Sequence, residues 1–578
     1  MKYQGIGASP GIAFGRALVL SEPEFLVENT AISPDHIDKE IERFEAALNR
    51  ATEAITRIEE ATRQMLGDDK GDIFAAHVLL LNDPEYIAAI KEKVKTEGIC
   101  ATAATQEITD SYCSLFSAIE DPYLRERETD LRDISRRLLR ELAGLPTDSL
   151  AHLTEPVILF AHDLMPSDMA QLDKSKVVGF ATALGSLTSH AVIMARSMEL
   201  PAVVGVGDVT GKVRTGDRVI LDGNEGIILL NPSCDDSEGY RLKQKNFEQQ
   251  QIDLKKGIDE PAVMADGTKI KIAANIGHPA DAKQAFHNRA TGIGLYRTEF
   301  LYMGRRELPT EEEQFEAYKT VAVLFGTRPV IIRTLDIGGD KELPCLDLPK
   351  EKNPFLGYRA IRLCLDRKDL FKTQLRAILR ASVYGNVKLM YPMIATLEEL
   401  QAANEILAEA KEELAADKIP FNSTIETGIM IEIPAAAVLA DQFAKEADFF
   451  SIGTNDLIQY TMAADRMSEK VANLYQPLNL AVLRLIQGVV RAAHSQGKHV
   501  GLCGEMAGDP IAIPLLVGLG VDELSMGAGS ILQARALLRR LTVSKAKSIA
   551  AVVMEMNSSR EIEDYIKQVL PPKGENFL

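Results

Sequence analysis

The second half of the chain contains eight short β-like runs, separated by stretches whose pattern is mostly helical. The runs are KIKIAANIG (269–277), GIGLYRTE (292–299), PVIIRTLD (329–336), VKLMYPMI (387–394), TGIMIEIP (427–434), FFSIGTND (449–456), HVGLCGEM (499–506) and DELSMG (522–527). Strands that alternate with helices form parallel sheets, and eight such units within about 315 residues fit a TIM barrel. The sequence therefore predicts a (β/α)8 barrel over residues 261–578.

Most of these runs end in residues that can do chemistry. The residues at or near the ends are Asn275, Arg297, Glu299, Arg333, Asp336, Glu432, Asn455, Asp456, Cys503 and Glu505. One such residue could be a strand-end salt bridge, but a trait shared by most runs is hard to attribute to packing. Because the active sites of such barrels lie at the C-terminal ends of the strands, we expect a site at this mouth.

The predicted mouth is rich in side chains that bind anions. They are Arg297, Arg333, Arg466, with Lys341 and Arg359 on loops nearby, and the amide donor Asn455. Arginine side chains bind phosphate and carboxylate groups through paired hydrogen bonds. The mouth is thus predicted to take a small ligand that carries several negative charges, including a phosphate.

Two carboxylates and a thiol complete the predicted mouth. Glu432 and Asp456 could hold Mg²⁺, which proteins bind through one or two carboxylates plus substrate oxygens and water. Cys503 lies between Gly501 and Gly504, which predicts an accessible thiol. A free cysteine is commonly a small buried apolar residue, but the position at the mouth favours a role in proton transfer.

The first half of the chain combines strands with a helical block. Strand patterns occur in residues 3–20 and return from residue 156, whereas apolar positions between Ile37 and Met65 repeat about every 3.5 residues, typical of a long helix in coiled-coil-like packing. Two strands cannot stand alone, so one interrupted α/β domain is expected. The predicted boundaries are 1–23 with 145–232 for this domain, 24–144 for the inserted helical block and 233–260 for a linker.

His190 lies within the stretch Gly185–Pro201, directly after Thr188 and Ser189 and before an apolar run. Threonine and serine are good N-cap residues, so His190 is predicted at a helix N-terminus, where backbone N–H groups and the helix dipole stabilise an anion. The alternative is a histidine that merely caps a helix. A histidine that carries phosphate and a barrel that binds a phosphorylated acid both fit phosphoryl transfer through a histidine nucleophile.

Composition limits the class of protein. The 578 residues predict two to four domains, and the net charge of −18 argues against nucleic acid and anionic membranes as partners. The six cysteines show no metal-ligand spacing, which favours a reducing compartment. The N-terminus lacks the apolar core of a signal peptide, and no apolar run is long enough to span a bilayer. A cytoplasmic protein without membrane insertion is expected.

The motifs resemble enzyme I of the bacterial phosphoenolpyruvate-dependent sugar phosphotransferase system along nearly the whole chain. The matching stretches are TSHAVIMARSMELPAVVG, GIGLYRTEFLYM, LPTEEEQF, IIRTLDIGGDKELP, NPFLGYRAIR, IEIPAA, FFSIGTNDLIQYTMAADR and GLCGEMAGD. The resemblance implies transfer of the phosphoryl group from phosphoenolpyruvate to a histidine of the enzyme and then to the carrier protein HPr, the first step of sugar uptake. It also implies a dimer formed through the barrels and an HPr-binding surface on the helical block.

The resemblance also assigns roles to individual residues. It implies that His190 is phosphorylated at Nε2, that Arg297, Arg333, Asn455, Asp456 and Arg466 contact phosphoenolpyruvate, that Glu432 and Asp456 bind Mg²⁺, and that Cys503 protonates the enolate carbon.

The chain departs from the family pattern near the nucleophile. Residues 183–187 read Ala-Leu-Gly-Ser-Leu where the family usually has Gly-Gly-Arg or a similar triplet, and Met169 replaces a frequent threonine. These changes affect the expected rate or stability of the phosphohistidine. One alternative is therefore a catalytically degenerate regulatory paralogue. Another is a dikinase or phosphoenolpyruvate synthase relative, which would need an ATP-binding domain ahead of His190.

Overall fold

The computed structural model describes the following residues: 1–20, 32–66, 68–117, 122–144, 155–170, 172–173, 175–185, 190–209, 211–303, 305, 307–339, 346, 348–349, 351–466, 468 and 470–570. The chain forms two compact units, Met1–Gln249 and Gln250–Leu578.

The first unit is built on an eight-stranded sheet with the order β1-β8-β7-β3-β4-β5-β6-β2. The strands are β1 (Lys2–Gln4), β2 (Ile6–Ser9), β3 (Ile12–Val19), β4 (Val157–Ala161), β5 (Val177–Thr182), β6 (Ala202–Val204), β7 (Arg218–Asp222) and β8 (Ile227–Leu230). Strand β3 pairs in parallel with β4, although the whole helical block lies between them in the sequence. The predicted interrupted α/β fold is confirmed by this pairing.

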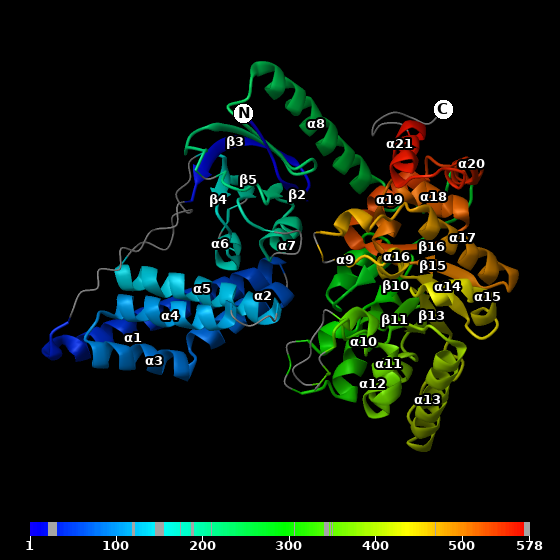
Figure 1. Ribbon diagram of the computed structural model, residues 1–578, viewed down its shortest axis with the longest axis horizontal. Coiled ribbons are helices and arrows are strands. Elements are labelled where there is room, and N and C mark those ends of the chain that lie inside the picture. Colours follow the sequence, from blue (N-terminus) through cyan, green and yellow to red (C-terminus); the bar gives the residue numbers. More distant parts are fainter. Residues whose placement is uncertain are drawn as a thin grey trace. The chain divides into compact units, whose positions relative to one another are not determined.

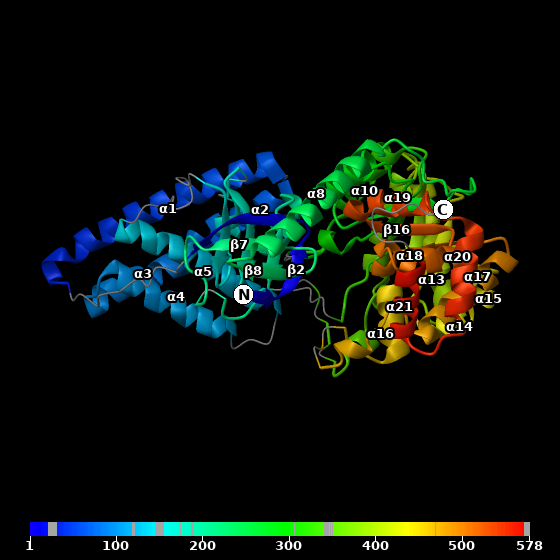
Figure 2. The same ribbon diagram turned by 90° about the horizontal axis from the view of Figure 1, so that it is seen from above.

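In its described residues the inserted block contains five α-helices, drawn in blue and cyan in Figure 1. They are α1 (Ile37–Leu66), α2 (Asp68–Leu81), α3 (Pro84–Glu97), α4 (Ala101–Ser117) and α5 (Pro122–Ala143). The long first helix, which Figure 2 shows along its length, buries Phe44, Leu48, Ala51 and Ile55, as the repeat predicts. The predicted boundaries of the block, 23/24 and 144/145, involve residues outside the described ones and stay predictions.

Buried polar contacts connect the bundle to the α/β part of the same unit. His77 in α2 is 1% exposed, and its Nε2 lies 3.1 Å from the Asp130 carboxylate of α5. Asp133 of α5 accepts hydrogen bonds from the Ser167 hydroxyl and backbone N–H, at 2.5 and 3.2 Å. Ser167 lies in α6 (Pro166–Ala170), which packs against α7 (His190–Ser197). The bundle is therefore fixed to the helix pair that contains His190.

The second unit contains a closed barrel of eight parallel strands, with the order β10-β11-β12-β13-β14-β15-β16-β9. The strands are β9 (Lys271–Ile276), β10 (Ile293–Tyr296), β11 (Val330–Arg333), β12 (Val387–Tyr391), β13 (Thr427–Ile431), β14 (Phe449–Ile452), β15 (His499–Leu502) and β16 (Glu523–Gly527). Each falls within one of the eight predicted runs, so the predicted TIM barrel is confirmed.

Helices cover the outside of the barrel (Figure 1). They are α9 (Asp281–His287), α10 (Glu311–Phe325), α11 (Ile361–Asp366), α12 (Lys368–Ala381), α13 (Leu397–Ala416), α14 (Pro434–Val438), α15 (Ala440–Phe443), α16 (Thr454–Met462), α17 (Leu480–Ser495), α18 (Ala512–Leu519), α19 (Ile531–Leu538), α20 (Val543–Val553) and α21 (Ser559–Val569). Helix α8 (Cys234–Lys256) lies within the stretch 233–260, whose role as a linker stays a prediction. Among the described residues, no helix has the length and apolar character needed to cross a membrane.

We expect two glycines in barrel helices to respond in opposite ways to alanine. A Cβ added at Gly518 in α18 would lie 2.1 Å from the Ala546 carbonyl oxygen of α20, whereas a Cβ at Gly488 in α17 would meet nothing within 4 Å. Gly518→Ala should therefore lower the free energy of unfolding by about 1–3 kcal/mol. Gly488→Ala should raise it by about 0.5–1 kcal/mol, because alanine loses less backbone entropy in a helix. Denaturant unfolding of both variants measures this, and equal effects would contradict the close packing of α18 on α20.

Candidate active site at the mouth of the barrel

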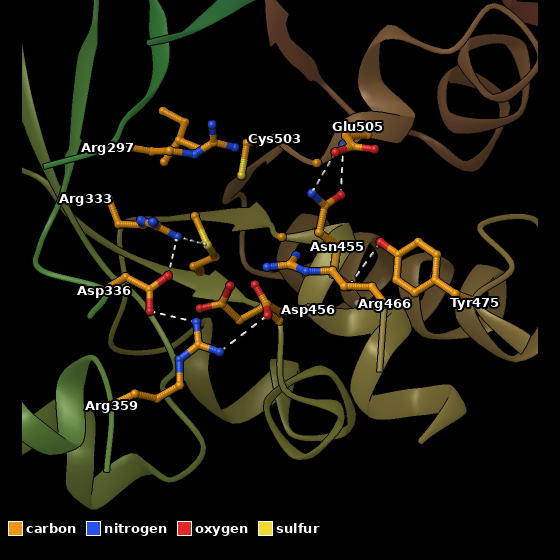
Figure 3. A pocket seen from close by; sticks show the side chains of 15 residues that line it. Arg297, Arg333, Asp336, Arg359, Asn455, Asp456, Arg466, Tyr475, Cys503 and Glu505 are labelled. Atoms are coloured by element: carbon orange, nitrogen blue, oxygen red, sulfur yellow. Dashed lines mark hydrogen bonds and ion pairs between the residues drawn. The ribbon is translucent and has the colours of Figure 1, made fainter. Parts of the chain in front are cut away.

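A pocket of about 490 Å³ opens at the C-terminal ends of the barrel strands (Figure 3). Its lining residues are Leu295, Arg297, Arg333, Asp336, Arg359, Met430, Glu432, Gly453, Asn455, Asp456, Arg466, Tyr475, Cys503, Gly504 and Glu505. The seven barrel residues to which the resemblance assigns a role all lie in this lining, whereas Asn275 and Glu299, also expected at the mouth, do not. The barrel thus brings together side chains from the ends of five strands, β10, β11, β13, β14 and β15.

Asp336 connects two arginines at the base of the pocket. Its two carboxylate oxygens lie 2.8 Å from Arg333 and 2.8 Å from Arg359, and Figure 3 shows it between them. Arg333 also pairs with the buried Glu299, and Arg359 lies 3.5 Å from Asp456. Burial alone lowers the pKa of each guanidinium, but the surrounding carboxylates outweigh it and raise both pKa values. Both arginines therefore stay charged in a dry environment.

Arg359 enters the site through an unusual stretch of backbone. Gly338 has φ +108°, and a Cβ there would lie 2.5 Å from the Arg359 Cβ, so only glycine leaves room for the arginine. Ala360, the residue after Arg359, has a φ of +51°, a conformation that alanine rarely adopts. The sequence analysis predicted Arg359 only on a loop near the mouth. The glycine pair in DIGGD is the one sequence feature that indicates a close approach of another side chain to this backbone.

Glu432 and Asp456 form a buried acidic pair beside these arginines. Oε1 of Glu432 accepts a hydrogen bond of 2.6 Å from the Met393 N–H, whereas its Oε2 has no hydrogen-bond partner among the described residues. Burial, then the neighbouring Asp456 and Asp336, raise the pKa of Glu432 to about 8. An unpaired buried carboxylate oxygen next to a second carboxylate fits a hard divalent cation such as Mg²⁺.

Cys503 lines the pocket but is less accessible than the sequence predicted. It is 3% exposed and belongs to an apolar cluster inside the barrel with Leu295, Ile331, Met390, Met430 and Phe449. Gly501 and Gly504 were expected to leave the thiol open, and that expectation was wrong because side chains of other strands cover it. Burial raises the pKa of the thiol to about 11, and the nearby Arg333 and Arg297 do not reverse this. The thiol is therefore protonated at neutral pH.

Asn455 and Arg466 lie at the other side of the pocket (Figure 3). The Asn455 side chain is oriented by Glu505, whose N–H donates to Oδ1 at 3.1 Å, and Nδ2 lies 3.5 Å from Oε1 of Glu505. The Tyr475 hydroxyl donates to the Asn455 carbonyl at 3.3 Å. The sequence analysis did not predict Tyr475 as a pocket residue, because it does not follow directly after a predicted strand. Lys341, which was predicted near the mouth, lies outside the described residues.

His190 is the first residue of α7, as predicted. The predicted cap residues Thr188 and Ser189 and the His190 side chain lie outside the part that the structure describes. Met169, the departure noted above, is 0% exposed and packs in one apolar cluster with Val192 and Met194 of α7. The methionine therefore adds to the core beneath this helix, where it offers no hydroxyl.

Family models match three parts of the chain. They are the PEP-utilising enzyme N-terminal model over residues 4–127, the mobile-domain model over 153–226 and the PEP-binding-domain model over 251–543. Curated relatives match almost its full length. Proteins named phosphoenolpyruvate-protein phosphotransferase from Bacillus sp. (strain S) and Geobacillus stearothermophilus are each 54% identical over 98% of this chain and 97% of their own. The chain belongs to the phosphoenolpyruvate-protein phosphotransferase family.

The family assignment extends beyond these two relatives. The phosphoenolpyruvate-protein phosphotransferase of Bacillus subtilis (strain 168) is 50% identical over 98% of this chain and 99% of its own. Members of this family are enzymes, and the pocket described above lies within the residues that the PEP-binding-domain model matches.

The pKa of Glu432 predicts how stability depends on pH. The folded pKa of about 8 lies above the ordinary value of 4.5, so between these values the folded state binds more protons than the unfolded state. The free energy of unfolding should fall as pH rises through this window, by at most about 1.4 kcal/mol per pH unit. Glu432→Gln removes this contribution, so melting temperatures measured without metal should fall less between pH 5 and 8 than those of the unmodified protein.

Magnesium should act in the opposite direction. A cation at the carboxylate pair favours its ionised form, so Mg²⁺ should raise the melting temperature of the unmodified protein at pH 8 more than that of Glu432→Gln. Parallel pH curves and equal responses to Mg²⁺ in the two proteins would contradict the buried, unpaired carboxylate.

Proposed function

We propose that this protein transfers the phosphoryl group of phosphoenolpyruvate to its own His190 and then to a histidine of the carrier protein HPr. The observation that carries the proposal is the pocket itself, where arginines surround two buried carboxylates and a protonated thiol. Phosphoenolpyruvate has a phosphate, a carboxylate and a carbon that needs a proton after the phosphoryl group leaves, and the pocket offers a group for each.

The pocket residues divide the work of the first step. Arg297, Arg333, Asn455 and Arg466 bind the phosphate and carboxylate of the substrate, since guanidinium and amide donors suit both groups. Nε2 of His190 attacks phosphorus, and the bond between phosphorus and the enol oxygen breaks. Cys503 then gives the proton of its thiol to carbon 3 of the enolate, which becomes pyruvate, and the resulting thiolate takes a proton from solvent.

Glu432 and Asp456 would hold Mg²⁺. Burial and the neighbouring Asp456 and Asp336 favour the protonated form of Glu432, so a cation held by this pair would displace that proton. Oε2 of Glu432, which has no hydrogen-bond partner among the described residues, faces Gly453, where a Cβ would lie 2.9 Å away. When bound, the ion supplies positive charge against the phosphate oxygens. Asp456 is proposed both to bind Mg²⁺ and to contact the substrate.

The proposal also covers the protein's partners and its location in the cell. The helical block, proposed as residues 24–144, docks HPr, and the barrel forms a homodimer. We infer no nucleic-acid partner from the net charge of −18. We infer a cytoplasmic location from the cysteine pattern, which favours a reducing compartment.

The altered residues at 183–187 were the support for a degenerate regulatory paralogue. The complete set of barrel residues in one pocket favours an active enzyme instead. The dikinase alternative has no supporting feature among the described residues of the first unit, which are occupied by the sheet and the helical bundle.

Labelling with ³²P-phosphoenolpyruvate and Mg²⁺ tests the proposal. The unmodified protein should take up label that is stable in base and labile in acid, as expected for a phosphohistidine. His190→Ala should fold normally, with an unchanged circular-dichroism spectrum, and should take up none. Undiminished labelling of His190→Ala would eliminate the assignment of the nucleophile.

Exposed leucines of the helical block provide a test of HPr docking. Leu79 of α2 and Leu115 of α4 are 76% and 61% exposed, which is unusual for large apolar side chains and typical of interface anchors. Changing either to serine should raise the KM for HPr roughly tenfold, because an interface anchor contributes about 1–2 kcal/mol. Labelling by phosphoenolpyruvate should not change.

Leu242 offers a matched control for these variants. It is 62% exposed on α8, outside the helical block, and Leu242→Ser should leave the KM for HPr unchanged. An equal effect of all three serine variants would contradict docking on the block.

A further inference from the structure

Asn275 lies at the mouth of the barrel, at the end of β9, but it is not part of the pocket lining. Its side chain reaches past β16 toward the end of β15, where its Nδ2 donates a hydrogen bond of 2.9 Å to the Cys503 carbonyl oxygen. The residue was expected at the site because it ends a strand. The structure shows that it contacts the backbone of Cys503.

The backbone of Cys503 needs such a partner. The ladder between β15 and β16 pairs Gly501 and Leu502, and stops before Cys503. On the other side, the Cys503 N–H donates to the Ile452 carbonyl of β14 at 3.0 Å. With Asn275 as donor, both backbone groups of Cys503 are hydrogen-bonded, one on each side of the strand. The thiol itself lies 3.7 Å from the Ile452 carbonyl oxygen and hydrogen-bonds with the Ser451 side chain, both on β14. Because both thiol contacts are to β14, the direction of the thiol also depends on where the backbone of Cys503 is held on its other side, toward β9.

A serine fixes which way the Asn275 amide points. The Ser525 hydroxyl, on β16, donates to Oδ1 of Asn275 at 2.6 Å, which leaves the Nδ2 end directed at Cys503. Ser525 is 1% exposed and packs against Gly294 of β10, where an added Cβ would lie 2.5 Å from the serine oxygen. The Cys503 carbonyl can only accept, so an amide turned by half a turn would place Oδ1 against it and lose that hydrogen bond, while the confined serine hydroxyl holds the other end of the amide.

We propose that Asn275, held by Ser525, is a positioning residue for proton transfer to carbon. It keeps the backbone of Cys503 where the thiol faces one side of the enolate. This inference rests on the proposed role of Cys503 as the acid. In the step concerned, the S–H bond of Cys503 breaks, a C–H bond forms at carbon 3 of the enolate, and the thiolate is protonated again by solvent. Asn275 donates no proton and touches no reacting atom.

The stereochemistry of the product methyl group tests this role. Phosphoenolpyruvate with deuterium at one defined position on carbon 3 is turned over in tritiated water with HPr as acceptor, and the pyruvate is trapped at once by lactate dehydrogenase and NADH. A fixed acid protonates one face and gives methyl groups of one configuration. In Asn275→Ala we expect mixed configurations and a fall in kcat of about tenfold to a hundredfold, since small misplacements of a catalytic group have effects of this size. The KM for phosphoenolpyruvate should stay within about twofold, because Asn275 does not line the pocket.

Two further variants separate positioning from folding. Asn275→Asp keeps the shape of the side chain but replaces the amide donor by an acceptor, so it should behave like Asn275→Ala without leaving a cavity. Asn288→Ala is the matched control. Asn288 donates a similar hydrogen bond of 2.8 Å to the Ala528 carbonyl elsewhere in the barrel, and its loss should leave kcat and configuration unchanged.

The outcomes test the positioning role of Asn275 separately from the acid role of Cys503. A single configuration and unchanged kcat in both Asn275 variants would overturn the positioning role. Cys503→Ala is run alongside, and if it keeps a single configuration and turnover within a few-fold, the acid role itself is wrong. Mixed configurations in Cys503→Ala with a single configuration in Asn275→Ala leave the acid role intact and exclude positioning by Asn275.

Discussion

The mouth of the barrel depends on a balance of buried charges. Asp336 lies between Arg333 and Arg359, Arg333 also contacts Glu299, and Arg359 reaches Asp456. A charge taken out of water is costly unless it is paired with good geometry, so these groups can remain buried only together. The chain therefore presents arginine donors to a phosphorylated substrate from a framework that is already neutralised by its own carboxylates. Within that framework Oε2 of Glu432 has no hydrogen-bond partner among the described residues, which leaves this oxygen open to a cation.

The barrel could be predicted because the sequence contains eight short apolar runs of similar length, most of which end in polar residues and all of which are separated by mostly helical stretches. It predicted the pocket residues because the C-terminal ends of parallel strands converge. It did not predict the environment of Cys503, since the two glycines beside it describe only its own strand. The side chains that cover the thiol come from other strands, among them Leu295 and Met430.

Sequence patterns also fail to predict contacts between residues that lie far apart in the chain. Asn275 was predicted at the mouth, but its bond to the Cys503 carbonyl depends on strand order and register, which sequence spacing does not give. Arg359 was placed on a loop because the backbone turn at Gly338 and Ala360 that carries it into the site involves no regular element. The helical block was predictable from its period, whereas its attachment through Asp133 and Ser167 was not.

The pairing of β3 with β4 also has a consequence for synthesis on the ribosome. The first three strands emerge early, but their neighbour β4 follows only after the five helices of the block. A helical bundle rich in local contacts folds fast, and domains form in order as the chain is made. Once the bundle has folded, the residues before and after it are held close together. The entropy lost when β3 and β4 pair is then smaller than for an unfolded insertion. The nascent chain thus assembles its inserted part before the sheet that surrounds the insertion point.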